Sequence, residues 1–239
     1  MAQYYTDFSS PNAVSEWTSR WADVPSISVH SEGEENYLEI ITRSSASRQF
    51  ISWDTVPDAA QVNVLMRVSG SLDRRICARG SGAIGSETGW TLGRRESTMA
   101  RVSRYLNGAF NNTANSSVFH STTTDVVFSE ANLDGSSLQW REWLTSDSAP
   151  DWRISINNSN ISEAGQTGIF LFEASLTLKV WSFAVGTDGD PAPTGPLSTT
   201  EAFALRHNPR TNKVIPVLSS PTVTDIGATC VRPRVSKGY

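Results

Sequence analysis

Apolar and polar residues alternate along much of the first 190 positions. Over residues 61–68, Val62, Val64, Met66 and Val68 occupy one side of an extended chain and Arg67 lies on the other. A period of two with β-branched residues is typical of a strand with one buried face. Similar patterns predict strands over residues 75–79, 90–95, 101–106, 124–129, 137–144, 152–156, 168–172 and 175–183.

Turn-forming residues separate these segments. Asn107-Gly108 is a signal for a two-residue hairpin, and the glycines of residues 80–89 predict a loop. The best helical candidate is Asn12–Trp21, where Val14, Trp17 and Trp21 recur at helical spacing. Many short strands with almost no helix predict an all-β fold, a two-sheet β-sandwich.

The composition changes at residues 186–196, which are rich in Asp, Gly and Pro. Beyond this break the only aromatic residues are Phe203 and Tyr239, too few for an independent core. The pattern therefore predicts a β-sandwich over residues 1–190, followed by a linker and an extended C-terminal arm over residues 191–239.

Residues 221–235 of this arm have an alternating pattern that suits an added strand. Val223 and Ile226 would lie on its two faces, and Arg232 and Arg234 contribute to its positive charge. We expect these four residues to attach the arm to another subunit. The alternative is an arm that wraps around its own sandwich.

Charge is distributed unevenly. The chain has 20 Lys and Arg against 24 Asp and Glu, a net charge of −4, which excludes a globally basic nucleic-acid binder. Residues 197–239 are positive, with six basic and two acidic residues, whereas the rest of the chain is negative. Opposed charges favour ordered contacts between copies or with a neighbouring protein, although a scattered solubilising surface gives the same counts.

The chain carries little that indicates export, membrane insertion or a disulfide framework. The first ten residues lack the pattern of a signal peptide, and no apolar run is long enough to span a membrane. Cys77 and Cys230 are far apart in sequence, so we expect free thiols in a reducing cytoplasm.

A search for catalytic patterns predicts no enzyme, no metal and no cofactor. Glu32-Gly33-Glu34-Glu35 is the nearest string to a glycosidase carboxylate pair, but its surroundings indicate a loop. His30, His120 and His207 lack metal-ligand spacing. Asp188 and Asp190 could bind calcium or form an Asp-Gly turn, and the sequence leaves both open.

The tryptophans divide into two groups. Trp140 and Trp181 lie in patterned strands and are predicted to be core residues. The others near strand ends or loops could seal the edge of the core or act as platforms for sugar rings; they are Trp17, Trp21, Trp53, Trp143 and Trp152.

Arginine is concentrated in residues 67–104, with eight Arg against three acidic residues. If the strand phases hold, one set of side chains points away from the apolar face: Arg67, Arg75, Arg79, Arg95, Arg101 and Tyr105. Guanidinium groups suit bidentate contacts with carboxylates or phosphates. The set predicts a face for an anionic partner or a glycan, such as an acidic polysaccharide or another subunit. The alternative is an exposed sheet that binds nothing specific.

Several runs resemble the closing strands of concanavalin A-like (laminin-G-like) jelly-roll domains. They are LQWREWLTSDSAPDWRISINNS with Pro150-Asp151-Trp152, the Gly165–Gly168 loop of GQTGIFLF, and VWSFAVGTDGDPAP. The opening DFSSPNAVSEWTSRW and the tail PVLSSPTVTDIGATCVRPRV are similar to segments of tailed-phage virion proteins. The resemblance implies a jelly-roll sandwich whose middle strands, including those of the arginine set, are neighbours on a broad sheet.

Two functions follow. The first is a non-enzymatic structural component of a tailed-phage virion, assembled in the host cytoplasm, attached by the arm to capsid or tail subunits. It would form a homo-oligomer and contact a host surface glycan, without binding nucleic acid or membrane. The alternative is a carbohydrate-binding or carbohydrate-degrading protein, a lectin or lyase of the same superfold.

Overall fold

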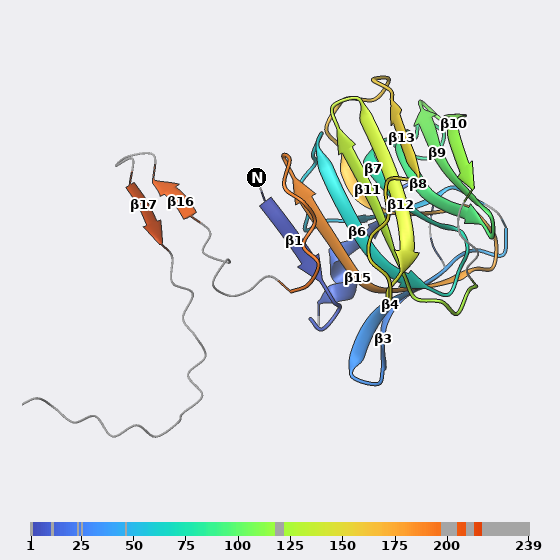
Figure 1. Ribbon diagram of the computed structural model, residues 1–239, viewed down its shortest axis with the longest axis horizontal. Coiled ribbons are helices and arrows are strands. Elements are labelled where there is room, and N and C mark those ends of the chain that lie inside the picture. The colour runs from blue at the N-terminus through green and yellow to red at the C-terminus, as the bar shows by residue number, and fades with distance from the viewer. Residues whose placement is uncertain are drawn as a thin grey trace, which may run out of the picture. The chain divides into compact units, whose positions relative to one another are not determined.

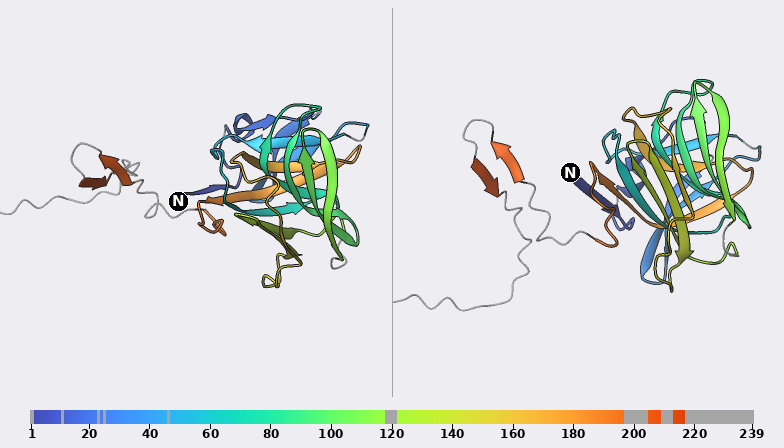
Figure 2. Two further views of the ribbon diagram at one scale, coloured as in Figure 1. Left: turned by 90° about the horizontal axis from the view of Figure 1, so that it is seen from above. Right: turned by 45° about the horizontal axis from the view of Figure 1, so that its top comes forward.

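The computed structural model describes residues 2–10, 12–22, 24, 26–45, 47–117, 122–196, 205–208 and 213–216. Two antiparallel sheets pack face to face and form a β-sandwich (Figures 1 and 2). One short 3-10 turn, η1 (Ala13–Glu16), is the only helical element among these residues. The all-β prediction is confirmed.

One sheet has eight strands. Its order is β13 (Ile154–Asn157), β12 (Ser137–Leu144), β11 (Val127–Asp134), β6 (Val62–Ser69), β15 (Thr177–Thr187), β4 (Glu35–Ile41) and β3 (Ser26–Glu32), and β1 (Ala2–Thr6) also pairs with β15. The other sheet has seven: β10 (Ala109–Ser117), β9 (Met99–Leu106), β8 (Thr88–Glu96), β7 (Arg74–Ser81), β14 (Gln166–Leu171), β5 (Gln49–Trp53) and β2 (Trp17–Ser19).

The segments in which apolar and polar residues alternate form strands close to the predicted bounds. β12 spans Ser137–Leu144 as predicted, whereas the strand expected over 124–129 is β11, Val127–Asp134. Asn107 and Gly108 join β9 to β10 with φ angles of 50° and 80°, the positive values that a two-residue hairpin requires.

The helical prediction for Asn12–Trp21 is wrong beyond its first turn. After η1 the chain extends into β2, where Trp17 stacks on Trp53 with ring centroids 5.9 Å apart and meets Phe183 at 5.2 Å. Trp21 lies at the opposite side of this sheet, against Phe50. The burial of these rings on two faces outweighs the local helical spacing.

The main core lies between the two sheets. Its largest buried side chains include Trp90, Trp140, Phe8, Phe183 and Leu38. Trp140 is a core residue as predicted, with its indole N–H donating to Ser129 Oγ at 3.0 Å. Trp181 is buried but lies outside this core, on the outer face of the eight-stranded sheet against Tyr37.

A charged cluster is buried with the apolar core. Glu142 on β12 accepts from Arg74 of β7 at 2.9 Å and from Arg94 of β8 at 2.7 Å. None of the three side chains is more than 1% exposed. Because one carboxylate bridges both sheets, this cluster fixes how they pack at that end of the sandwich.

The chain divides into two units, 1–197 and 198–239. Contacts of the first unit continue past residue 190, since Ala192 N donates to Asn63 Oδ1 at 2.8 Å and Ala192 is buried. The second unit contains an antiparallel hairpin of β16 (Leu205–Asn208) and β17 (Lys213–Pro216). The arm residues Val223, Ile226, Arg232 and Arg234 lie outside the described residues, as do Cys230 and His120.

Candidate functional site

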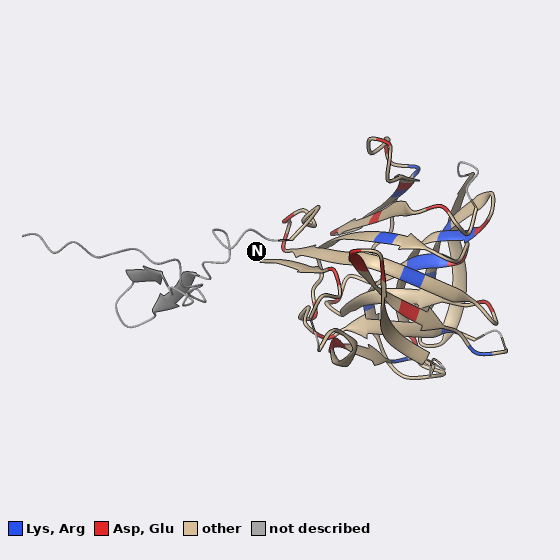
Figure 3. Cartoon of the chain, turned by 90° about the horizontal axis from the view of Figure 1, so that it is seen from below, with Lys and Arg blue, Asp and Glu red and all other residues tan. Residues whose placement is uncertain are grey.

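Each sheet has one outer face, turned away from the core, and both outer faces carry pockets. Lys and Arg positions lie within strands of the sandwich as well as in its loops (Figure 3). The pocket on the seven-stranded sheet has a volume of about 240 Å³ and is lined by Arg48, Arg75, Arg95, Tyr105, Phe110 and Phe172. We call it the arginine groove. The lining contains three cationic and three aromatic side chains.

A second hollow of about 370 Å³ shares Arg48 and Phe172 with this pocket, so the two adjoin. It extends past Trp21 and Ile84 to Glu87 on the loop before β8. Together they give the face an elongated depression. Pockets for small molecules commonly have about 300–1,000 Å³, so the two hollows together are large enough for more than one sugar ring.

Asp73 fixes Arg75 at the floor of the groove. The carboxylate of Asp73 accepts from Arg75 Nε at 2.7 Å and Nη2 at 3.0 Å, and its residue is fully buried. It also accepts the backbone N–H groups of Phe172 and Glu173 at 2.8 and 3.1 Å. One carboxylate thus positions both an arginine and the segment that carries an aromatic wall.

The other two arginines also lie on aromatic rings. The Arg48 guanidinium lies 5.1 Å from the Tyr105 ring centroid, and its Nη1 donates to Gly108 O at 2.7 Å and Glu87 at 3.2 Å. Arg95 lies 5.6 Å from the Phe172 ring. Its Nε is buried without a hydrogen-bond partner among the described residues. Cation–π contacts of this kind hold guanidinium groups flat against rings.

An aromatic cluster supports the groove from below. Tyr105 packs within 5.3–5.4 Å of the rings of Trp21, Phe110 and Phe170. Burial raises the pKa of Tyr105, so its phenol keeps its proton at neutral pH. Gly93 on β8 leaves the space that Arg75 occupies, because a Cβ there would lie 3.0 Å from Arg75 Cγ and 2.4 Å from a backbone oxygen.

The residues of the predicted arginine face are divided between the two sheets. Arg75, Arg95 and Tyr105 come together in the groove, but Arg67 lies on β6 in the other sheet. The alternation correctly placed the Arg67 side chain on the side of its strand that faces away from the core. It carried no information about which sheet that strand joins, so the expectation of one shared face is wrong.

Arg79 does not face a partner either. Its backbone has a φ of 54° at a bulge in β7, and its guanidinium donates to the carbonyls of Ala60, Ile161 and Gly135 at 2.7–2.8 Å. Burial lowers the pKa of Arg79. It therefore ties loops together. Arg101 lies on the same face as the groove but outside its lining, 3.8 Å from Glu96.

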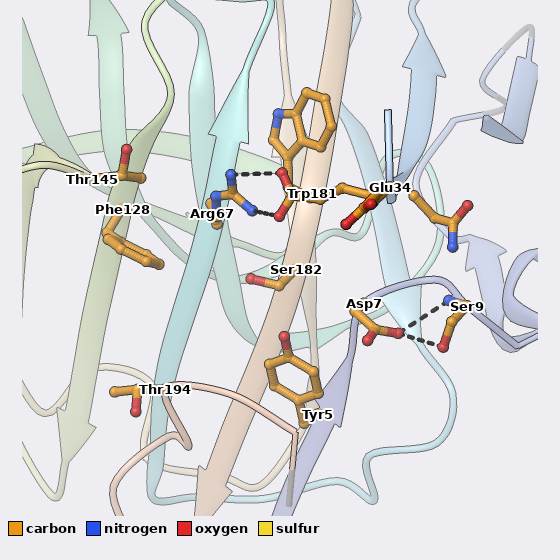
Figure 4. A pocket seen from close by; sticks show the side chains of 12 residues that line it. Tyr5, Asp7, Ser9, Glu34, Arg67, Phe128, Thr145, Trp181, Ser182 and Thr194 are labelled. Atoms are coloured by element: carbon orange, nitrogen blue, oxygen red, sulfur yellow. Dashed lines mark hydrogen bonds and ion pairs between the residues drawn. The ribbon is translucent and has the colours of Figure 1, made fainter. Parts of the chain in front are cut away.

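The larger pocket, of about 470 Å³, lies on the outer face of the eight-stranded sheet (Figure 4). We call it the Arg67 pocket. Arg67 makes a bidentate ion pair with Glu35 and lies 5.6 Å from the Trp181 ring. Tyr5 forms the other end of the pocket, with its hydroxyl pointing toward Ser182 (Figure 4).

Acidic side chains also line this pocket. Asp7, Glu34 and Glu35 all face it, and Asp7 accepts from both the backbone N–H and the hydroxyl of Ser9. The ion pair with Arg67 lowers the pKa of Glu35. A general acid of a glycosidase needs a raised pKa, so Glu35 is poorly suited to that role.

The acidic segments that the sequence singled out lie in turns between or after strands. Glu32 ends β3, Glu35 begins β4, and the turn between them has Gly33 at a φ of 65°, so the predicted loop is a hairpin turn. Asp188 and Gly189 also have positive φ and form a turn after β15. In the described part of the chain, no cluster of three or more His, Cys, Asp or Glu side chains could hold a metal ion. Among the same residues, no helix is long and apolar enough to cross a membrane.

Of the tryptophans left open by the sequence, Trp17, Trp21 and Trp53 are buried, and Trp21 also borders the second hollow. Trp143 and Trp152 are half-buried on the eight-stranded side, where Arg141 lies 5.4 and 4.3 Å from their rings.

Sequence reasoning missed Arg48, Phe110 and Phe172 as site residues. Arg48 precedes β5 and belongs to no alternating run, and Phe110 and Phe172 lie at or beyond strand ends. The local signal in the sequence was an aromatic residue close to the Asn107-Gly108 turn, and the structure leaves 46% of this residue, Phe110, exposed.

No protein-family model and no curated protein matches the chain. Among solved structures, the VIP36 exoplasmic/lumenal domain bound to Ca²⁺ and Man3GlcNAc is similar with a TM-score of 0.54 and 10% identity, covering 80% of this chain and 90% of that one. The legume lectin-like domain from Entamoeba histolytica gives 0.51 and 14%, covering 74% and 92%.

The carbohydrate binding module CBM66 from Bacillus subtilis gives a TM-score of 0.50 at 13% identity, covering 69% of this chain and 91% of that one. At these identities the likeness establishes the fold. The protein is a two-sheet jelly-roll β-sandwich of the kind found in lectin-like and carbohydrate-binding domains, as the sequence resemblance implied.

Proposed function

We propose that this chain is a non-enzymatic carbohydrate-binding domain and that the arginine groove holds the saccharide. The observation that carries the proposal is the convergence of three aromatic rings and three guanidinium groups on one concave pocket. Ring faces stack on the apolar faces of sugars, and guanidinium N–H groups donate to their oxygens.

The solved structures support the same function. They are a carbohydrate binding module, a legume lectin-like domain and a domain bound to Man3GlcNAc. The fold hosts many activities, so the argument for binding rests on the groove itself.

A glycan array probed with the full chain tests the proposal. We expect bound saccharides, and we expect Phe110→Ala to weaken their binding about tenfold or more, because burying a Phe side chain contributes about 1.5–3 kcal/mol. Val14→Ala is the matched control, since Val14 is also an exposed apolar residue but lies outside both pockets.

The Arg67 pocket is the competing location. If Phe128→Ala abolishes glycan binding while Phe110→Ala leaves it unchanged, the saccharide lies on the eight-stranded face. The proposal that the arginine groove binds it is then wrong. If the folded chain binds no glycan at all, the proposed function is wrong.

The predicted role in a tailed-phage virion remains a separate proposal. It rests on the resemblance of the opening and closing segments and on the positive charge of residues 197–239. The comparisons connect the chain with no virion protein. Mass spectrometry of purified virions would detect the chain at a fixed copy number if the proposal holds, and a host-glycan adhesin would satisfy both proposals.

A further inference from the structure

The arginine groove is cationic because the acidic partners of Arg75 and Arg48 are buried, although Glu96, 3.7 Å from Arg95, is exposed. The six lining residues include Arg48, Arg75 and Arg95 and no acidic side chain. Asp73, which pairs with Arg75, is fully buried, and the side chain of Glu87, which pairs with Arg48, is 4% exposed. A ligand entering the groove therefore first meets the partly exposed guanidinium groups of Arg48 and Arg95, whereas the side chain of Arg75 is only 3% exposed.

Each guanidinium keeps a donor for a ligand after its internal contacts. Asp73 takes Nε and Nη2 of Arg75, which leaves Nη1. Glu87 and Gly108 take Nη1 of Arg48, which leaves Nη2. Among the described residues, Nε of Arg95 has no hydrogen-bond partner, and its nearest carboxylate, Glu96, is 3.7 Å away.

A buried donor without an acceptor is costly, and a ligand oxygen that reached Arg95 Nε would remove that cost. The cost is tolerated in a pocket that is completed by its ligand. Exposed arginines that merely keep a protein soluble point freely into water, whereas these three lie against the rings of Tyr105, Phe170 and Phe172. Such rings and ion pairs hold the groups in place before binding.

We infer that the saccharide held in the arginine groove is acidic, and that the carboxylate of a uronic acid residue is bound by Arg48, Arg75 and Arg95. The inference rests on the proposed function and names its ligand class. A planar carboxylate matches the guanidinium fork, and the uncharged faces of the same sugar pack on Phe110 and Phe172.

The test uses pairs of saccharides that differ only in charge. Isothermal titration of the full chain would compare oligogalacturonate, oligomannuronate and oligoglucuronate with the methyl ester of each. We expect at least one acid to bind ten times or more tightly than its ester. Binding should weaken as salt rises from 20 to about 200 mM, because exposed charges are screened at that ionic strength.

Arg95→Gln tests the residue with the free donor. Its Nε makes no internal hydrogen bond, and its contacts with the Phe172 ring and Glu96 are at 5.6 and 3.7 Å, so the variant should fold with an unfolding midpoint lowered only slightly and lose about tenfold in affinity for the acid. The affinity for the methyl ester should change much less. Arg153→Gln is the matched control, because Arg153 is exposed and lies outside the groove.

The outcomes separate this inference from the proposed function. If esters bind as tightly as acids, and Arg95→Gln changes neither affinity, the inference of an acidic ligand is wrong, while the proposed glycan binding is unaffected. If sulfated saccharides are titrated as well and only they bind, the groove binds an anion, but the assignment of a carboxylate is overturned. If no saccharide, acidic or neutral, binds the folded chain, both fail.

Discussion

The two outer faces of the sandwich each present arginine, a carboxylate and aromatic rings, yet their pockets have opposite character. In the arginine groove the carboxylate Asp73 lies beneath Arg75 and is fully buried. In the Arg67 pocket the side chain of Glu35 is 54% exposed and lines the pocket beside its partner Arg67. The position of the carboxylate, and not the number of arginines, decides what a ligand encounters.

The difference also concerns rigidity. Around the groove, Trp21, Phe50, Tyr105 and Phe170 are buried against one another and form a second apolar cluster outside the main core. On the opposite face, Tyr5, Phe128 and Trp143 are only partly buried against a small cluster. A site preorganised by buried rings loses less entropy on binding, which favours the groove as the more specific of the two.

Removing the carboxylate from each ion pair tests the difference between the two faces. We expect Asp73→Ala to lower the free energy of unfolding by about 3–5 kcal/mol, because it leaves the Arg75 charge buried and uncompensated. It also removes the acceptor for the N–H groups of Phe172 and Glu173. Glu35→Ala should cost about 1 kcal/mol or less, as exposed ion pairs do.

Urea denaturation of the two variants measures both values. Similar costs for Asp73→Ala and Glu35→Ala would mean that the two pairs are equally exposed to solvent, and the distinction between the faces would be lost.

The alternation of residues predicted both faces only in part. β12 was predicted to the residue because Leu138, Trp140 and Glu142 alternate with half-buried positions, and that pattern is local. The sheet to which each strand belongs depends on pairings distant in sequence, so Arg67 was grouped with arginines of the other sheet. The fold class could be predicted, but the membership of the site could not.

Irregular backbone accounts for most other errors. A bulge in β7 and a positive φ turn Arg79 toward loop carbonyls, and no pattern of period two can anticipate this. Arg48 joins the groove from a segment without alternation, through contacts with Glu87 and Gly108. Asp73 was counted only as one of three acids among eight arginines, although its burial makes it the residue that orders the site.

A substitution of Gly93 tests how far the arginine groove depends on the close approach of two backbone segments. An alanine Cβ there would lie 2.4 Å from Arg74 O and 2.7 Å from Arg75 Cα, so strand β8 would shift away from β7. We expect Gly93→Ala to destabilise the protein by about 1–3 kcal/mol, the usual cost of overpacking. It should also weaken saccharide binding, since Arg75 would move.

Thermal unfolding measures the stability of this variant. Gly195→Ala is the control, because a Cβ at Gly195 would meet no atom within 4 Å, and we expect a change of about 0.5 kcal/mol or less. If Gly93→Ala keeps wild-type stability and affinity, the groove does not depend on the close approach of β7 and β8.

The smallest expected effect concerns the titration of Glu35 in the Arg67 pocket. Hydrogen bonds from Arg67 lower the pKa of Glu35 in the folded protein, so the ion pair stabilises the fold above the ordinary glutamate pKa of about 4.3. The contribution is lost as pH falls through the lowered folded value, where Glu35 takes up a proton. NMR titration of the Glu35 carboxyl carbon should give a midpoint below the ordinary glutamate value, and Arg67→Gln should raise it toward that value. An ordinary midpoint for Glu35 would show that the ion pair is broken in solution, which would leave Arg67 free to bind anions and would make the two faces alike.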